Sequence, residues 1–251
     1  MNSIRILEGK IALVTGTSSG IGRSIVEKFA ECGAIVYANA RKNDSLDNWA
    51  IEISTKYNTK VMPLYFDVVD AVLCKENVLK IKNEHGKIDI LVNNAGMVTY
   101  EMISMVQLEV FKKMWETNVI GSFNLLQLIS RIMSRQQEGS IINMASIVGD
   151  KGAKGQVSYA TTKGAIIAMT KAAAKELANL NIRVNAVAPG MVSTDRFVKV
   201  LETSFKDKIN QVGMKRLGNP EEIADLCLFL ASEKSKYITG QIIGIDGSLE
   251  L

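Results

Sequence analysis

Residues 10–32 read KIALVTGTSSGIGRSIVEKFAEC. The first six form a short apolar run of strand-forming type, and the glycine-rich turn 16–22 follows directly. From Arg23 onward apolar residues recur with helical spacing, and a second apolar run follows at 34–38. This order predicts a strand–helix–strand unit whose glycines let the backbone approach a pyrophosphate at a helix N-terminus. A ligand-free tight turn is the alternative for the glycines alone, and the surrounding elements favour the dinucleotide.

The alternation of strand and helix patterns continues to the end of the chain. Further strands are expected at 61–66, 87–96, 139–146, 182–190 and 238–247. Helices are expected at 70–84, 107–135, 157–179 and 221–231. Such alternation predicts a parallel sheet with helices on both faces, and right-handed crossovers make it doubly wound. No linker or composition break divides residues 1–251, so we expect a single three-layer α/β domain.

Charge and cysteine content argue against several classes of protein. The chain has 251 residues, 30 basic and 26 acidic side chains and a net charge of +4, without long runs of like charge, which argues against a nucleic-acid partner. No apolar stretch reaches the roughly 18 residues of a membrane-spanning helix, and the N-terminus lacks a signal-peptide pattern. Three isolated cysteines indicate a reducing compartment, so we expect a cytoplasmic location and no membrane partner. The single histidine, His85, argues against a Ser-His-Asp hydrolase and a zinc site, so no metal is expected.

A second informative stretch is SIVGDKGAKGQVSYATTK at 146–163. Tyr159 and Lys163 are about one helical turn apart and lie on one helix face. A nearby ammonium lowers the pKa of a phenol from its usual value of about 10, which makes Tyr159 a usable proton donor. Ser146, after an apolar run, can hydrogen-bond the same substrate oxygen. The pair alone would also fit a half-buried tyrosine beside a solvated lysine, and the remaining motifs favour catalysis.

Several short motifs follow one another along the chain. They are Thr15-Gly16-x-x-x-Gly20-Ile21-Gly22, Asp67, Asn93-Asn94-Ala95-Gly96, Asn118, Ser146, Tyr159-x-x-x-Lys163 and Pro189-Gly190. Together they resemble the short-chain dehydrogenase/reductase family over essentially the whole chain. Within it, the segments GKIDILVNNAG, GQVSYATTKGAI, IRVNAVAPG, RLGNPEEIA and YITGQIIGIDG resemble the 3-oxoacyl-[acyl-carrier-protein] reductase branch. The resemblance implies a Rossmann fold with a seven-stranded parallel sheet, an NAD(P)-dependent oxidoreductase and a homotetramer.

The resemblance also implies roles for individual residues. Tyr159 would exchange the proton, Lys163 would lower its pKa and hold the nicotinamide ribose, and Ser146 would orient the carbonyl. Asn118 would hold a water that relays protons toward Lys163, and a helix-interior amide bonded to backbone is compatible with the same role. Asp67 would accept from the adenine amino group, or else cap the following helix. The expected cofactor-binding residues are Gly16, Ser18, Ser19, Gly20, Ile21, Gly22, Arg41, Asp67, Val68, Asn94, Ala95, Gly96, Tyr159, Lys163, Pro189, Gly190, Val192 and Thr194.

The end of the second strand bears on the choice of cofactor. The sequence there is Tyr37-Ala38-Asn39-Ala40-Arg41-Lys42, with Ala40 about where an acidic residue would select NAD. Arg41 can hold a 2′-phosphate through charge-assisted hydrogen bonds. We therefore expect NADP(H) in preference to NAD(H), with a solvated surface arginine as the alternative.

The substrate is the least constrained feature of the sequence. The resemblance implies reduction of a 3-oxoacyl thioester to a 3-hydroxyacyl thioester, as in fatty-acid synthesis. It also implies an acidic acyl carrier protein that binds at the matching positions Arg131 and Lys175, and Arg135 could extend this patch. Scattered basic residues on solvated helices are the alternative to such a patch. The expected apolar lid residues are Met191, Phe197, Val198 and Leu201. The alternatives are another small ketone, such as a keto-sugar or cyclic ketone, and a non-catalytic dinucleotide-binding protein.

Overall fold

The computed structural model describes residues 5–195, 197 and 206–250. Its centre is one seven-stranded sheet in the order β3-β2-β1-β4-β5-β6-β7, in which neighbouring strands are parallel. The strands are β1 (Ile11–Val14), β2 (Ile35–Ala40), β3 (Val61–Tyr65), β4 (Ile90–Asn93), β5 (Gly139–Met144), β6 (Ile182–Pro189) and β7 (Ile242–Ile245). The expected doubly wound α/β fold with a seven-stranded parallel sheet is confirmed.

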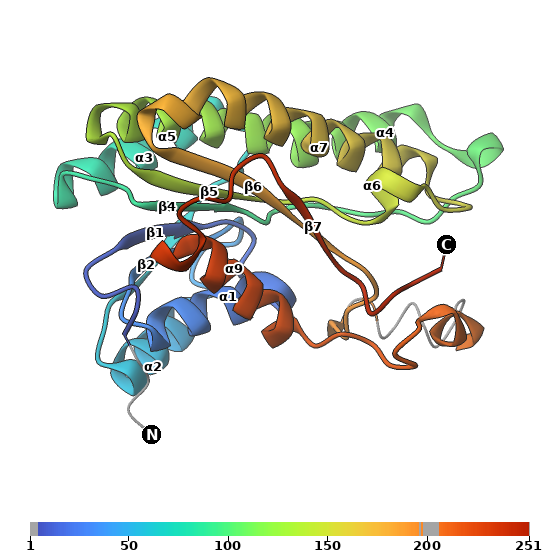
Figure 1. The fold of residues 1–251 in the computed structure, drawn as a ribbon, viewed down its shortest axis with the longest axis horizontal. Helices are drawn as coiled ribbons and strands as arrows, with labels where there is room; N and C mark the ends of the chain where they lie inside the picture. Colours follow the sequence, from blue (N-terminus) through green and yellow to red (C-terminus); the bar gives the residue numbers. More distant parts are fainter. Residues whose placement is uncertain (1–4, 196, 198–205, 251) are drawn as a thin grey trace.

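Helices cover both faces of this sheet. The α-helices are α1 (Gly20–Glu31), α2 (Asp47–Tyr57), α3 (Ala71–His85), α4 (Leu108–Trp115), α5 (Gly121–Gln136), α6 (Val148–Lys151), α7 (Val157–Leu177) and α9 (Pro220–Ala231). Shorter helical turns are η1 (Ile103–Met105), η2 (Glu116–Ile120), η3 (Ala178–Leu180), η5 (Lys206–Gln211) and η6 (Glu233–Ser235). Helices α1, α2 and α9 lie on one face, and α3, α4, α5 and α7 lie on the other, which gives three layers (Figure 1).

Side-chain alternation along each strand divides the core between the two faces of the sheet. In β1, Ala12 and Val14 pack in the same cluster as Phe29 of α1. Ile11 and Leu13 pack in the opposite cluster, with residues of α3 and α5. All four positions of β1 are buried. A strand covered on both faces needs apolar residues throughout, which explains the continuous apolar run in the sequence.

Two helical elements differ from the sequence expectation. The sequence pattern predicts no helix between the second and third strands, yet α2 lies there. Its buried residues are Trp49, Ala50 and Ile53, and so narrow an apolar face leaves little periodicity to detect. The helix expected over 107–135 is interrupted by the π-helical turn η2, which contains Asn118. Such turns within α-helices often occur at functional sites.

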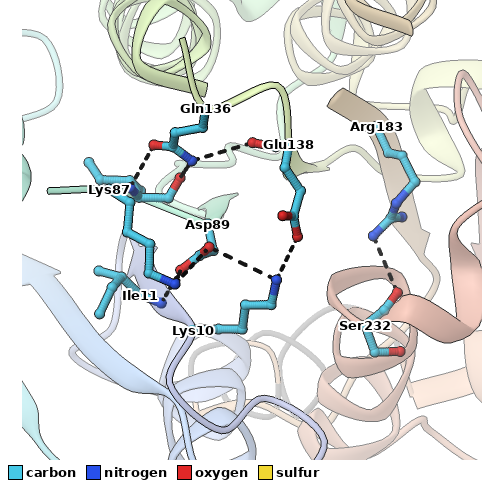
Figure 2. Close-up of polar contacts among 9 residues, drawn as sticks. Lys10, Ile11, Lys87, Asp89, Gln136, Glu138, Arg183 and Ser232 are labelled. Atoms are coloured by element: carbon cyan, nitrogen blue, oxygen red, sulfur yellow. Dashed lines mark hydrogen bonds and ion pairs between the residues drawn. The ribbon is translucent and has the colours of Figure 1, made fainter. Parts of the chain in front are cut away.

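The amino-terminal edge of the sheet carries a cluster of paired charges (Figure 2). Asp89, just before β4, accepts from the backbone N–H of Ile11 at 2.7 Å and lies 3.0 Å from Lys87 Nζ. Lys10 Nζ lies 2.6 Å from Glu138 Oε1 and 4.0 Å from Asp89 Oδ1. Partial burial opposes the charge on Lys10, but the hydrogen bond and charge of Glu138, with Asp89, raise its pKa above the usual value. These groups therefore stabilise one another.

The described residues contain no helix that is both long and apolar enough to cross a membrane. Within the same part of the chain, no group of three or more His, Cys, Asp or Glu side chains could hold a metal ion. The cysteines Cys32, Cys74 and Cys227 are buried and form no disulfide.

Candidate active site

A cavity of about 630 Å³ opens at the carboxyl-terminal edge of the sheet. It lies where β1 has β2 on one side and β4 on the other, which is the switch in strand order where doubly wound sheets bind ligands. Its walls come from the turn after β1, the ends of β2, β4, β5 and β6, the start of α7 and the C-terminal segment. Every cofactor and catalytic residue expected from the sequence lines this cavity, except Asn118.

The glycine-rich turn forms a rigid cradle in this cavity. Gly16 has a φ of 67°, and a Cβ on Gly22 would overlap the Gly16 carbonyl and the Asn94 amide. Asn94 Nδ2 donates to the carbonyls of Thr15 and Gly16 at 2.9 and 3.0 Å. Thr15 Oγ1 accepts from the backbone N–H groups of Asn94 and Ala95 at 3.0 and 2.9 Å. Hydrogen bonds therefore join the glycine-rich turn to the turn after β4, and the close contact leaves no room for a side chain at Gly16 and Gly22.

Helix α1 begins at Gly20, directly at the cavity. Ser19 occupies the N-cap without a side-chain cap, and the first turn contains no acidic residue. The first backbone N–H groups and the positive end of the helix dipole are therefore available to a ligand. The narrow cradle and these donors fit the pyrophosphate of a dinucleotide.

Lys163 is a buried lysine with 5% exposure. Its Nζ donates to the carbonyl of Met144 at 2.6 Å and lies 5.7 Å from the centre of the Tyr159 ring. None of the ion pairs in the described part of the chain includes Lys163. Burial lowers the pKa of Lys163 to about 8, because low-dielectric surroundings disfavour the ammonium. At neutral pH the side chain is still mostly protonated and can stabilise a phenolate one turn away on α7.

Ser146 follows β5 and is 7% exposed. Its Oγ accepts from the backbone N–H of Val148 at 3.3 Å. The half-buried Tyr159 enters the same cavity from the first turn of α7. The end of β5 and the start of α7 thus bring a serine hydroxyl, a tyrosine phenol and a lysine ammonium to one cavity, the groups that general acid catalysis on a carbonyl requires.

Asn118 lies outside this cavity, in the π-helical turn η2, and is 1% exposed. Its Oδ1 accepts from the N–H of Met97 at 2.8 Å, and its Nδ2 donates to the Met97 carbonyl at 2.9 Å. Nδ2 also donates to Thr162 Oγ1 at 3.0 Å, and that hydroxyl donates to the Tyr159 carbonyl at 2.9 Å. Both amide hydrogens are therefore used within the protein. The side chain is thus a helix-interior amide bonded to backbone, an arrangement compatible with the expected water relay, and it joins the loop after β4 to α7.

Arg41 and Asp67 line the cavity at the ends of neighbouring strands. Arg41 is exposed, whereas Ala40 before it is buried. Asp67 Oδ1 accepts from the backbone N–H of Val69 at 3.1 Å. The N-cap of α3 is Asp70, whose side chain accepts from two backbone N–H groups of the first turn. The alternative in which Asp67 caps this helix is therefore wrong, and Asp67 lines the cavity instead.

Some residues that line the cavity were not among the expected site residues. They are Asn39, Ala40, Met97, Val98, Tyr100, Lys113, Thr117, Met144, Ala145, Ile147, Val148, Gln156 and Leu249. Of the expected lid residues, Met191 and Phe197 line the cavity, whereas Val198 and Leu201 lie outside the described residues. Most of the missed residues are neighbours of predicted ones, so the flanks of each motif were a usable signal. Leu249 has no such neighbour.

Comparisons with known proteins agree with this geometry. A family model described as Enoyl-(Acyl carrier protein) reductase matches residues 16–249. A protein named 3-oxoacyl-[acyl-carrier-protein] reductase FabG from Thermotoga maritima is 42% identical over 243 residues, which cover 97% of this chain and 98% of that protein. A 3alpha-hydroxysteroid dehydrogenase from Mediterraneibacter gnavus is 37% identical, with 97% and 98% covered.

Solved structures are similar over the same length. L-sorbose reductase from Gluconobacter frateurii, complexed with NADPH and L-sorbose, has a TM-score of 0.92 and 31% identity, with 98% of each chain covered. A short-chain type dehydrogenase/reductase from Mycobacterium marinum has a TM-score of 0.88 and 38% identity, with 97% and 96% covered. The protein is accordingly an oxidoreductase that uses a nicotinamide dinucleotide. The chain belongs to the short-chain dehydrogenase/reductase family, in the branch of the 3-oxoacyl-[acyl-carrier-protein] reductases.

Proposed function

We propose that this enzyme reduces the ketone of a 3-oxoacyl thioester to a secondary alcohol with NADPH. The observation that carries the proposal is the convergence of Ser146, Tyr159 and Lys163 on a cavity that also contains a pyrophosphate cradle. When bound, the reduced nicotinamide supplies a hydride. The relatives named as FabG reductases support a thioester substrate, and the hydroxysteroid dehydrogenase and sorbose reductase are the basis of the alternative, another small ketone.

In the proposed mechanism, the hydroxyls of Ser146 and Tyr159 hydrogen-bond the oxygen of the substrate carbonyl. Tyr159 donates its proton to this oxygen as negative charge develops there, and Ser146 stabilises that charge. The Lys163 ammonium stabilises the phenolate that remains on Tyr159. Because the Met144 carbonyl holds Lys163 Nζ at 2.6 Å, the ammonium keeps a defined position during proton transfer. In the oxidative direction, Tyr159 accepts the proton of the alcohol.

The preference for NADP(H) follows from the residues at the end of β2. Arg41 can bind a 2′-phosphate, and Ala40 offers no carboxylate to a ribose 2′-hydroxyl. The ratio of kcat/KM for NADPH to that for NADH tests this preference. Arg41→Ala should lower the ratio by about tenfold or more, the loss expected for a hydrogen bond to a charged group. Lys42→Ala is the matched control, because Lys42 is exposed but does not line the cavity. A wild-type preference for NADH would contradict the proposal.

Steady-state kinetics on a panel of ketones test the substrate class. The panel contains an acetoacetyl thioester, a keto-sugar and a cyclic ketone, each with NADPH. The proposal expects the highest kcat/KM for the thioester. A higher kcat/KM for one of the free ketones would make the protein a reductase of that compound. Tight NADPH binding without turnover of any ketone would instead indicate a non-catalytic dinucleotide-binding protein.

We infer that an acidic acyl carrier protein docks at Arg131 of α5 and Lys175 of α7. Both residues are exposed, and neither lines the cavity. Lys175 is near the far end of α7, with about 18 Å of helix rise between it and Lys163. The carrier would therefore have to deliver its acyl group through a long arm. The kcat/KM for a carrier-linked thioester should fall at high salt and in Arg131→Ala. An unchanged value in this variant would contradict carrier docking at this patch.

We infer a homotetramer, as the family resemblance implies. Four large apolar side chains are exposed in the single chain. Three of them lie along the helical stretch from α4 to α5 and one at the start of α7: Trp115, Ile120, Phe123 and Val157. Exposed apolar side chains of this kind indicate a contact with another chain. Sedimentation equilibrium should give the tetramer mass, and Phe123→Glu should give smaller species. A monomeric wild type at micromolar concentration would contradict this inference.

A further inference from the structure

The last described residues of the chain fold back onto the active-site cavity. Leu249, two residues before the end of the chain, is 3% exposed and lines this cavity. It packs in a cluster with Ile147 and Val148, the two residues that follow Ser146, and Tyr159 packs against the same cluster. Leu249 therefore belongs to the wall at the reacting end of the cavity rather than to the pyrophosphate cradle.

Backbone hydrogen bonds hold this C-terminal segment in place. An antiparallel bridge joins Leu249 to Val212, and the N–H of Glu250 donates to the carbonyl of Gln211 at 3.0 Å. The two residues after Val212 donate their N–H groups to carbonyls of the segment at 3.1 and 3.0 Å. Because these peptide groups are paired, the wall formed by Leu249 has a defined position.

Lys151 of α6 adds a side-chain anchor to the same segment. Its Nζ donates to the carbonyl of Leu249 at 3.2 Å and to Asp246 Oδ2 at 3.3 Å. Asp246 Oδ1 also accepts from the N–H of Ser248 at 3.1 Å. Helix α6 follows Ser146 closely in sequence, so it links the C-terminal segment to the reacting end of the cavity. Lys151 thus holds the C-terminal segment at Asp246 and Leu249.

The chemistry of a thioester substrate determines which part of it meets this wall. A thioester joined to a carrier must leave the cavity toward solvent on the side of its sulfur atom. The alkyl group lies on the other side of the ketone, away from the sulfur, and in this proposal it faces the wall at Leu249. We propose that Leu249 limits the length of the alkyl group that the enzyme accepts, so that the C-terminal segment determines substrate specificity. This inference rests on the proposed reduction of 3-oxoacyl thioesters.

Two substrates with the same head group test the proposal. They are the acetoacetyl and 3-oxodecanoyl thioesters of N-acetylcysteamine, measured with saturating NADPH. Leu249→Ala should raise the ratio of kcat/KM for the long substrate to that for the short one by about tenfold, as expected for a small change of volume in an apolar pocket. Leu249→Phe should lower the ratio. The KM for NADPH should stay unchanged in both variants.

Val212→Ala is the matched control for Leu249→Ala. Val212 is 2% exposed and packs in the same cluster, but it does not line the cavity. This variant should lose thermal stability while the ratio of kcat/KM values stays unchanged. Lys151→Met should raise the ratio of kcat/KM values less than Leu249→Ala does, and the change should lie in the KM for the long substrate. Lys151→Arg should restore the wild-type ratio, because arginine again supplies a hydrogen-bond donor.

The outcomes separate this proposal from the proposed function. An unchanged ratio in Leu249→Ala, with acetoacetyl turnover retained, overturns the role of Leu249 and leaves thioester reduction standing. An equal increase in Val212→Ala also overturns it, since loosening of the cluster would then explain both. If the wild type reduces another ketone and neither thioester, the proposed reduction of thioesters is wrong. Short and long homologues of that ketone then test whether Leu249 limits the length of the substrate. If no ketone is reduced, both proposals fail.

Discussion

Lysines at the two ends of the parallel sheet have opposite electrostatic surroundings. At the amino-terminal edge, Lys10 contacts Glu138 at 2.6 Å and Asp89 at 4.0 Å, and these carboxylates raise its pKa against the effect of burial. At the carboxyl-terminal edge, Lys163 contacts the Met144 carbonyl and has no carboxylate partner among the described residues, and burial lowers its pKa to about 8. A buried charge without an ion-pair partner is costly, so the presence of Lys163 indicates the edge of the sheet where chemistry takes place.

The same contrast holds for two amides at opposite ends of β4. Before the strand, the Gln136 side chain accepts from the N–H of Ile88 and donates to its carbonyl, both at 3.0 Å (Figure 2). After the strand, Asn118 forms the same pair of bonds with Met97 at 2.8 and 2.9 Å. Asn118 alone continues through Thr162 to the catalytic part of α7. The Gln136 and Asn118 side chains therefore form the same local hydrogen bonds, but only those of Asn118 connect to the helix that carries Tyr159 and Lys163.

Removal of the phenol should produce the largest effect at the carboxyl-terminal edge. Tyr159→Phe should lower kcat by about 10²–10⁴-fold, the contribution of a positioned general acid. The dissociation constant for NADPH should change little, because the hydroxyl is directed at the substrate. Tyr37→Phe is the control, since Tyr37 is a buried tyrosine outside the cavity that donates to Glu84 at 2.8 Å. Single-turnover rates measure the step, and retention of more than roughly a tenth of the wild-type rate would refute the assignment.

Replacement of the buried lysine should change how stability depends on pH. In the folded protein Lys163 has a pKa of about 8, against a usual value of 10.5. Between these values the unfolded chain keeps a proton that the folded chain has released, so stability rises with pH. Relative to Lys163→Met, the wild type should gain about 1 kcal/mol between pH 8 and pH 9, measured by urea unfolding without cofactor.

Other groups titrate near this range, so only the difference between the two proteins is informative. Burial raises the pKa of Cys74 to about 12 and raises that of Cys227. These thiols reduce the stability of both proteins as the pH rises above their usual range. Lys10→Met should show no comparable difference between pH 8 and pH 9, because its pKa is raised. Identical slopes for wild type and Lys163→Met would contradict the lowered pKa of Lys163.

Removal of the Asn118 or the Gln136 amide should have similar effects on stability and different effects on kcat. Asn118→Leu and Gln136→Leu each leave a backbone N–H and a carbonyl without their partner, so each should lower the free energy of unfolding by about 1–3 kcal/mol. Asn118→Leu should also lower kcat by about tenfold or more, because the position of Tyr159 changes. Thermal unfolding and kcat measure the two effects. Equal losses of kcat in both variants would assign the effect to general destabilisation.

The smallest effect is expected for the charge pair at the amino-terminal edge. Glu138→Gln should lower the free energy of unfolding by less than about 1 kcal/mol, because the pair is partly exposed to solvent. The hydrogen bond from Lys10 lowers the pKa of Glu138, so this contribution is present at neutral pH and is lost as the pH falls through the folded-state pKa. Unfolding at pH 7 and at pH 3 measures it. A loss of kcat in Glu138→Gln would contradict the assignment of the chemistry to the carboxyl-terminal edge of the sheet alone.

The parts of the site that were predicted from the sequence are those with a local cause. The turn at Gly16–Gly22 and the Tyr159–Lys163 pair follow from spacing along the chain, and the structure places both at the cavity. Helix α2 was missed because it buries only a narrow face. The water relay expected at Asn118 stays a prediction, and its side-chain bonds to Met97 and Thr162 could not be predicted because these partners are distant in the chain.

By itself the sequence determined the alternation of strands and helices, the glycine-rich turn and the Tyr159–Lys163 pair. Each of these features depends on residues that are close together in the chain. Only the tertiary structure decided that Lys10 has carboxylate partners while Lys163 has none among the described residues, because ion pairs depend on which strand ends lie side by side. It alone also placed Leu249 in the active-site wall. Leu249 packs in one cluster with Val148, which is far away in the chain, and no local pattern predicts that folding brings the two residues into the same cluster.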